Sequence, residues 1–437
     1  MGFHERTTTV SEGIMKWVLV IVSILFCQLA RAEVHIEAGE DPGTWEQYSQ
    51  NKSSLEVEPG RETVVTRDGL TLSLKHFSRP GAVPVLLIHG LAENDRIWDA
   101  RMKRFSFARY LHSEGFDVWV GNMRGAGTEG FRSDTPAGPH VWSTDDYAIY
   151  DIPALANKVR EATGQRFWLI GHSLAAWAIE GYLAGLNFDS EGVPMPVKKL
   201  FDQRASAIRG VVSVAGIYNI WWQNSINSSE LAPMSAEEDY YHSNYELELL
   251  AKTRPLYYIV PQVSKLPVGW LKLMLGMRLN EIPFVGSQLQ GLYENMIDTV
   301  ASAPIFSMFY YAPNAEPDLV RMYSVDGLED LSTHILEQIG NAVIERATSS
   351  YYHLDPPDSR FMYASIRKLS RLPTLFVGGG RDRLANAEMI YQDGYGKSEA
   401  PDKLFLGVPL FGHLDILQGI HAPHDVMAPI AKWLHER

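Results

Sequence analysis

The feature that most constrains the fold is an abrupt change from a strand pattern to a helix pattern around Ser173. An apolar run at 166–170 leads into the segment GHSLA, residues 171–175, and a run of small and apolar residues follows. A serine on so tight a turn projects its hydroxyl above the edge of a sheet, and the turn requires small residues two positions before and after it. Gly171 and Ala175 meet that requirement, although the usual pattern, G-x-S-x-G, ends in glycine. Taken alone, the segment is also compatible with a helix capped by serine.

Strand and helix patterns alternate on both sides of this turn. The expected strands are 62–66, 70–77, 83–88, 117–120, 166–170, 208–215, 374–377 and 403–406. The expected helices are 99–113, 145–163 with a kink at Pro153, and a last helix at the C-terminal end. Strands that are apolar on both faces and alternate with helices form parallel sheets covered on both sides. The sequence therefore predicts an α/β fold with a mostly parallel sheet.

The alternation stops near Gly216 and resumes at Pro373. The residues between them are rich in aromatic side chains and methionine, and they do not alternate between strand and helix patterns. We expect 217–364 to form a helical insertion between two parts of the core, 59–216 and 365–437. An ordinary helical subdomain and a cap that lines a pocket for an apolar group are both compatible with this composition.

The N-terminal segment has the pattern of a secretory signal peptide. Lys16 precedes an apolar run at 17–29, and the sequence A-R-A ends at position 32. We expect residues 1–32 to be the signal peptide, with cleavage after Ala32, and 33–58 to be a lead-in to the core. The apolar run is shorter than the roughly 18 to 20 residues that span a bilayer, which disfavours a membrane anchor. The predicted location is outside the cell or in a periplasm.

Composition excludes several classes of function. With 437 residues, of which 46% are hydrophobic, the chain can bury a large core and still hold an insertion. The formal net charge of −13 disfavours nucleic-acid binding, because phosphate contacts require basic patches. The single cysteine, Cys27, lies in the expected signal peptide, so we expect no disulfide, catalytic cysteine or cysteine-bound metal in the mature chain.

A serine hydroxyl becomes a useful nucleophile only when a base removes its proton, and a histidine base needs a carboxylate that fixes its tautomer. After a turn of this kind, the acid and then the base follow in loops behind later strands. Asp382 follows the expected strand 374–377, and His413 follows the expected strand 403–406. We therefore predict Ser173 as nucleophile, Asp382 as acid and His413 as base.

A tetrahedral intermediate also needs two N–H donors for its oxyanion. One comes from the residue after the nucleophile, Leu174, and the other from the loop after an earlier strand, where Leu91 follows His89 and Gly90. The dipeptide at 89–90 is by itself compatible with a simple turn from strand to helix.

Other patterns suggest a cofactor or a metal. The segment GAGTEG at 125–130 matches G-x-G-x-x-G, but the residues after it are typical of a loop and not of the helix that a dinucleotide site requires. His421 and His424 have the spacing of a metal pair, yet solvent-exposed capping residues at the start of the last helix explain them better. His172, next to Ser173, is expected to point elsewhere. We therefore predict neither an organic cofactor nor a metal.

The motifs together resemble α/β-hydrolase-fold lipases of the acid lipase type, which includes gastric and lysosomal acid lipases. The matching segments are LIHGL at 87–91, VWVGNMRG at 118–125, YDIPA at 150–154, GHS at 171–173, GGRDRLA at 379–385 and GHLD at 412–415. The resemblance implies the roles already given to Ser173, Asp382 and His413, places the oxyanion donors on Leu91 and Leu174, and implies a helical cap that controls acyl-chain access.

These patterns predict a secreted serine hydrolase that cleaves carboxylic esters, lipid-like ones above all, through an acyl-enzyme on Ser173. The expected partners are an apolar ester substrate and a lipid surface that the cap contacts. Two alternatives stay open. The same residues could act on thioesters or polyesters or transfer acyl groups, or the chain could be a binding protein on a hydrolase scaffold. An aspartate nucleophile, as in haloalkane-type enzymes, is excluded at position 173.

Overall fold

A computed structural model describes residues 56–128, 130–137, 142–218, 265–266, 309–332 and 372–437, and positions 334, 335, 338, 339, 342, 348, 350 and 351. Backbone contacts divide the chain into two units, and all described residues belong to the unit formed by Glu40–Met277 and Phe309–Arg437. The predicted signal peptide, 1–32, and most of the predicted insertion, 217–364, lie outside the described residues.

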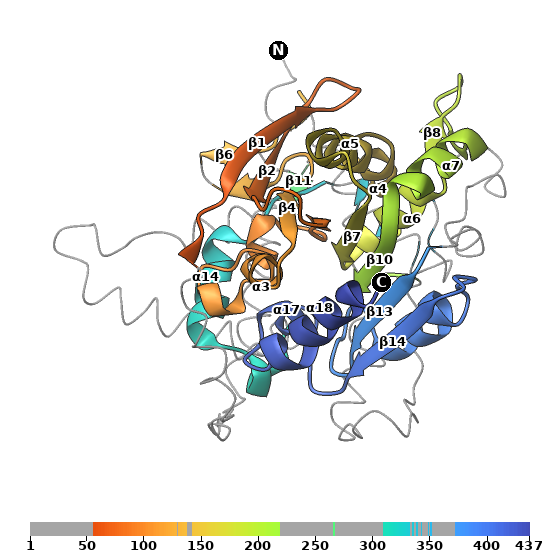
Figure 1. The fold of residues 1–437 in the computed structure, drawn as a ribbon. Helices are drawn as coiled ribbons and strands as arrows, with labels where there is room; N and C mark the ends of the chain where they lie inside the picture. The colour runs from red at the N-terminus through yellow and green to blue at the C-terminus, as the bar shows by residue number, and fades with distance from the viewer. Residues whose placement is uncertain are drawn as a thin grey trace, which may run out of the picture. The chain divides into compact units, whose positions relative to one another are not determined.

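An eight-stranded sheet forms the core of this unit (Figure 1). Its strands are β1 Gly60–Val65, β2 Thr71–Phe77, β3 Pro84–Ile88, β4 Asp117–Gly121, β7 Phe167–His172, β10 Ile208–Val214, β13 Thr374–Gly379 and β14 Lys403–Val408. Their order is β1-β2-β4-β3-β7-β10-β13-β14. The pairs β1–β2 and β2–β4 are antiparallel, and every pair from β4 to β14 is parallel. The predicted mostly parallel sheet is confirmed.

Helices cover both faces of the sheet. The α-helices are α3 Phe107–Ser113, α4 Thr144–Asp146, α5 Ile152–Thr163, α6 Leu174–Leu183, α7 Lys198–Ala207, α14 Pro317–Asp326, α16 Ala387–Met389, α17 Asp415–Gln418 and α18 Ala428–His435. Strand β7 shows how the two faces are used, since successive residues of a strand point to opposite sides. Trp168 contacts Trp433 of α18, with ring centroids 5.2 Å apart, whereas Gly171 packs against Ile179 of α6. Helices α18 and α6 therefore lie on opposite faces (Figure 1).

The predicted helix 99–113 is wrong in its first half. The helix α3 begins only after Ser106, whose hydroxyl caps it by accepting the N–H of Arg109 at 3.2 Å. Upstream, the carboxylate of Asp99 is bound to the ammonium of Lys75 at 2.7 Å and to the guanidinium of Arg109 at 3.0 Å. These tertiary contacts favour two short 3-10 turns, η2 Asp95–Ile97 and η3 Lys103–Phe105, over a continuous helix.

The predicted break in the helix 145–163 exists, but it precedes the proline. A π-helical segment, η4 Tyr147–Asp151, joins α4 to α5. Pro153 lies in the first turn of α5, where a missing N–H costs little because that turn has no partner for it within the helix. Two further π-helical segments, η10 Ile390–Tyr395 and η11 Pro423–Met427, and a 3-10 turn, η7 Ala312–Asn314, also occur among the described residues.

Among the described residues, three small ribbons lie outside the main sheet. They are β5 Gly127–Thr128 with β6 Phe131–Arg132, β8 Leu186–Phe188 with β9 Pro194–Pro196, and β11 Lys265–Leu266 with β12 Leu331–Ser332. The first occupies the G-x-G-x-x-G segment, so a hairpin stands where a dinucleotide site would need a helix. A Cβ on Gly127 would lie 2.6 Å from the carbonyl oxygen of Phe131, which explains why glycine occurs there.

No helix within the described part of the chain has the length and apolar character needed to cross a bilayer.

Candidate active site

Ser173 occupies a strained turn between β7 and α6. Its φ is 55° and its ψ is −122°, a backbone conformation that non-glycine residues rarely adopt. Backbone hydrogen bonds hold it: its N–H donates to the carbonyl of Val214 at 2.9 Å, and its carbonyl accepts the N–H groups of Ala176 at 3.1 Å and Ile217 at 3.3 Å. The end of β10 therefore fixes the serine at the carboxyl edge of the sheet.

Close packing around this turn explains its small residues. A Cβ on Gly171 would lie 2.5 Å from Cδ1 of Ile179 and 3.1 Å from Cβ of Ala175. A Cβ on Gly90 would lie 2.7 Å from Cβ of Ser173. A larger residue at Gly90 would overlap the side chain of Ser173, and one at Gly171 would displace the end of the Ile179 side chain, whereas the methyl group of Ala175 is fully buried and fits. The alanine in place of the usual glycine is compatible with the turn.

The structure brings Ser173, His413 and Asp382 together. Nε2 of His413 lies 2.8 Å from Oγ of Ser173, and Nδ1 lies 2.8 Å from Oδ2 of Asp382. The other carboxylate oxygen of Asp382 accepts the N–H groups of Leu384 and Ala385, both at 2.8 Å. All three side chains are buried, with at most 4% of each residue exposed. This geometry suits transfer of the serine proton to a histidine that a fixed carboxylate orients.

One predicted oxyanion donor, Leu174, directly follows Ser173, and the other, Leu91, lies in the loop after β3. Leu174 is the first residue of α6, so its N–H has no partner within the helix. Leu91 directly follows Gly90, which lies against Ser173. The next residue, Ala92, has a positive φ of 54°, and its carbonyl accepts the N–H of Glu329 at 2.8 Å. The residues on both sides of Leu91 are therefore held in place, Gly90 by its packing against Ser173 and Ala92 by its hydrogen bond with Glu329.

The side chain of His89 connects this loop to the segment after β4. Its Nε2 accepts the N–H of Met123 at 3.0 Å, so Nδ1 carries the proton and donates to the carbonyl of Gly90 at 2.9 Å. Burial lowers the pKa of His89 and keeps the ring in the neutral form that this bonding needs. The orientation of the peptide that precedes Leu91 thus depends on a neutral histidine.

The loop that carries His413 is anchored by Asp415. One oxygen of this buried carboxylate accepts the N–H of Tyr311 at 3.0 Å and that of Gly412 at 3.0 Å, and the other accepts the amide of Asn314 at 2.9 Å. The segment that returns from the predicted insertion is therefore bound directly to the loop of the predicted base.

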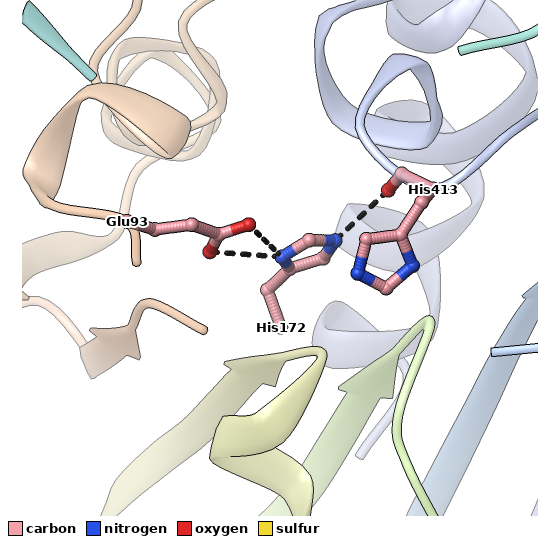
Figure 2. A group of neighbouring side chains, drawn as sticks. All are labelled: Glu93, His172 and His413. Carbon is pink, nitrogen blue, oxygen red and sulfur yellow. Dashed lines mark hydrogen bonds and ion pairs between the residues drawn. The ribbon is translucent and has the colours of Figure 1, made fainter. Parts of the chain in front are cut away.

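Sequence reasoning missed one residue of the site, Glu93, and misjudged another, His172. As expected, the imidazole of His172 is not the partner of the Ser173 hydroxyl, but it contacts the backbone of His413 and the carboxylate of Glu93 (Figure 2). Glu93 lies in the polar stretch AEND, which looks like a solvent-exposed loop. A buried partner 79 positions along the chain leaves no signal in local spacing.

The same three residues are the group of possible metal ligands among the described residues, since atoms of Glu93, His172 and His413 lie within 4.8 Å of one another. His421 and His424 do not belong to it. His424 is exposed and pairs with Asp425, with Nδ1 and Oδ1 2.6 Å apart, which agrees with a surface position near the last helix.

The parallel sheet, the strained serine turn and the later acid and histidine define an α/β-hydrolase-fold protein. Residues 83–176 match the family model described as alpha/beta hydrolase fold.

The curated relatives to which the chain is similar are lipases. Triacylglycerol lipase 2 of Arabidopsis thaliana is 33% identical over 159 residues, which cover 33% of this chain and 35% of the relative. Lipase member K of Homo sapiens is 34% identical over 122 residues, covering 25% of this chain and 31% of the relative. A putative lysosomal acid lipase/cholesteryl ester hydrolase of Crotalus adamanteus is 31% identical over 175 residues, covering 36% and 43%. The predicted resemblance to acid-type lipases is confirmed, and the chain spans about a third of the length of the first two relatives.

Proposed function

We propose that the chain is a serine hydrolase that cleaves carboxylic esters of lipid-like molecules through an acyl-enzyme on Ser173. The observation that carries this proposal is the continuous hydrogen-bonded series from the hydroxyl of Ser173 through the ring of His413 to the carboxylate of Asp382. The printed names of the relatives, which are lipases, favour ester substrates with apolar acyl groups.

The reaction follows from these positions. Nε2 of His413 takes the proton of Ser173 as Oγ attacks the ester carbonyl carbon, and Asp382 keeps the other ring nitrogen protonated and stabilises the imidazolium. The N–H groups of Leu91 and Leu174 stabilise the oxyanion. The intermediate then collapses: the bond to the alcohol oxygen breaks, and His413 donates its proton to the departing alcohol. A water molecule, deprotonated in turn by His413, releases the acid and restores the serine.

We further propose that residues 1–32 direct secretion and that residues 217–364 form a cap that admits the acyl chain. The printed name of the Crotalus adamanteus relative, a putative lysosomal acid lipase, and the signal-peptide pattern of residues 1–32 support a secretory route. The apolar and aromatic content of the inserted segment supports a cap that contacts lipid.

The test is hydrolysis of a series of p-nitrophenyl esters, from acetyl to palmitoyl, by the unmodified chain and by Ser173→Ala. We expect the alanine variant to lose more than about 10⁴-fold in kcat, as removal of a serine nucleophile does elsewhere. The matched control is Ser206→Ala, an exposed serine of α7, which leaves turnover unchanged. Unchanged turnover in Ser173→Ala would overturn the role of Ser173 as nucleophile, and a preference for acetyl esters would contradict the lipid-like substrate.

A further inference from the structure

A buried glutamate and a buried histidine link the two loops on either side of Ser173. The carboxylate oxygens of Glu93 lie 2.9 Å and 3.0 Å from Nδ1 of His172 (Figure 2). One of the same oxygens accepts the N–H of Gly90 at 2.5 Å. On the other side of the ring, Nε2 of His172 lies 3.0 Å from the backbone carbonyl of His413. The pair therefore spans from the predicted oxyanion loop to the loop of the predicted base.

The number of protons in this pair follows from its bonding. A carbonyl oxygen only accepts hydrogen bonds, so Nε2 of His172 carries a proton. Its Nδ1 faces two carboxyl oxygens, so the hydrogen bond there requires a second proton, held either by the ring or by the carboxyl. The lowered pKa of Glu93 and the raised pKa of His172 assign this proton to the ring, so that His172 is an imidazolium and Glu93 is its counter-charge. Loss of one proton would leave a nitrogen lone pair facing a carboxylate between two buried side chains, and the hydrogen bond would break.

The electrostatics agree with this assignment. Burial lowers the pKa of His172, but the charge and hydrogen bond of Glu93 outweigh it and raise that pKa above its usual value. Burial likewise raises the pKa of Glu93, and the charge of His172 outweighs it, so that the pKa of this carboxyl is lowered. The paired form is therefore stable over a wide range, and it is lost as the pH rises through the pKa of His172.

The surrounding titratable groups do not replace His172 as the group that titrates in this pair. They are His89, Asp95, Tyr310, Tyr323, Glu329, Asp382, Asp415 and His413. Burial raises the pKa of Asp415 on the base loop to about 7, so this carboxyl ionises as the pH rises, and the ionised form accepts its backbone hydrogen bonds more strongly, which does not produce an alkaline decline. Burial keeps His89 neutral and raises the pKa of both tyrosines well above the usual value. The carboxylates Asp95, Glu329 and Asp382 pair with Lys75, Arg132 and His413.

A metal at this place would have to displace existing bonds. Both ring nitrogens of His172 are engaged by Glu93 and by the carbonyl of His413. Both ring nitrogens of His413 are engaged by Asp382 and by Ser173. An ion pair between Glu93 and His172 is compatible with all of these hydrogen bonds.

We propose that Glu93 and His172 are positioning residues that hold the oxyanion loop and the base loop in register, and that deprotonation of His172 limits turnover at alkaline pH. The inference rests on the proposed serine-hydrolase function. Neither side chain is hydrogen-bonded to Ser173 or to the ring of His413; each bonds to the backbone of Gly90 or His413, and the ring centroids of His172 and His413 lie 4.8 Å apart. A displacement of about 1 Å in such groups can lower turnover about a hundredfold, so the pair acts on kcat and leaves KM nearly unchanged.

The conservative substitution Glu93→Gln separates charge from position. Its amide oxygen can accept the N–H of Gly90, and its amide nitrogen can donate to Nδ1 of a neutral His172, which still donates from Nε2 to His413. All the hydrogen bonds are then retained without the titrating proton. We expect Glu93→Gln to keep kcat within about threefold near neutral pH and to lose the alkaline decline of the unmodified chain. We expect Glu93→Ala to lower kcat by about 10- to 100-fold with little change in KM.

The measurement is kcat and KM as a function of pH, followed in a pH-stat with a butyryl ester, together with thermal unfolding of each variant. The matched control is His424→Gln, which removes an exposed histidine–aspartate pair and leaves the pH profile unchanged. An alkaline decline in Glu93→Gln equal to that of the unmodified chain would overturn the inference, and so would a normal kcat in Glu93→Ala. Turnover by the unmodified chain keeps the proposed function in either case, whereas its absence would overturn both.

Discussion

The contact between β7 and α6 beneath Ser173 offers a quantitative test of the fold around the nucleophile. A methyl group at Gly171 would lie 2.5 Å from Cδ1 of Ile179 and 3.1 Å from Cβ of Ala175. Carbon atoms in contact are normally about 3.5–4.0 Å apart, so the first overlap is about 1 Å and the second a few tenths of an ångström. Relief of the first overlap forces Ile179 out of its rotamer or moves the helix. We expect Gly171→Ala to lower the free energy of unfolding by about 1–3 kcal/mol.

A second substitution removes the atom that causes most of this cost. Ile179→Val deletes Cδ1 and by itself costs about 0.5–1.5 kcal/mol. In that background the new methyl group meets only the milder contact with Ala175, so the cost of Gly171→Ala falls. We expect a coupling free energy of about 1 kcal/mol or more between the two positions, in the favourable direction.

The assay is denaturant unfolding of the unmodified chain, the two single variants and the double variant, followed by tryptophan fluorescence. Gly60→Ala is the matched control: a Cβ there has its nearest neighbour at 3.7 Å, on an edge strand, and we expect almost no change. Strict additivity of the two substitutions, or a neutral Gly171→Ala, would refute the proposed packing of strand against helix.

Two further predictions concern buried charge and acid stability. Arg124→Ala removes the guanidinium that bonds to buried Asp151 at 2.7 Å, and we expect it to lower the free energy of unfolding by about 3–5 kcal/mol. Arg437→Ala breaks an exposed pair with Asp402, and we expect a loss of about 0–1 kcal/mol; equal losses in denaturant unfolding would contradict this difference. Burial lowers the pKa of His89, so below about pH 6.5 the unfolded chain binds a proton there that the folded chain does not. The free energy of unfolding therefore falls as the pH drops below about 6.5, by up to about 1.4 kcal/mol per pH unit. His89→Gln should flatten that slope, and an unchanged slope would argue against a neutral histidine.

The sheet was predictable because burial on both faces leaves a local signal. Strands such as β3 and β10 are nearly continuous apolar runs, and their positions agree with the predicted ones to within two residues. Ser173, Asp382 and His413 were predicted because each follows a strand, and parallel strands bring their carboxyl ends to one edge. Their mutual distances confirm that they meet, although their catalytic roles stay a proposal.

Features that depend on distant partners were not predictable. The first half of the expected helix 99–113 is absent because Asp99 binds Lys75 and Arg109, and no local pattern reveals those contacts. The role of Glu93 depends on His172, which lies at the end of β7, at the same carboxyl edge of the sheet as the loop of Glu93 after β3. Both cases involve charged residues that look like surface positions in the sequence and prove to be buried.

The most direct test of the account is covalent labelling of the unmodified chain with a fluorophosphonate, followed by mass spectrometry of the labelled peptide. Such a reagent phosphonylates a serine whose proton a neighbouring base removes, and it mimics the tetrahedral intermediate. If His413 activates Ser173, we expect one label per chain, located on Ser173. Absence of the label, or a label on a different residue, would contradict the claim that Ser173 is the nucleophile.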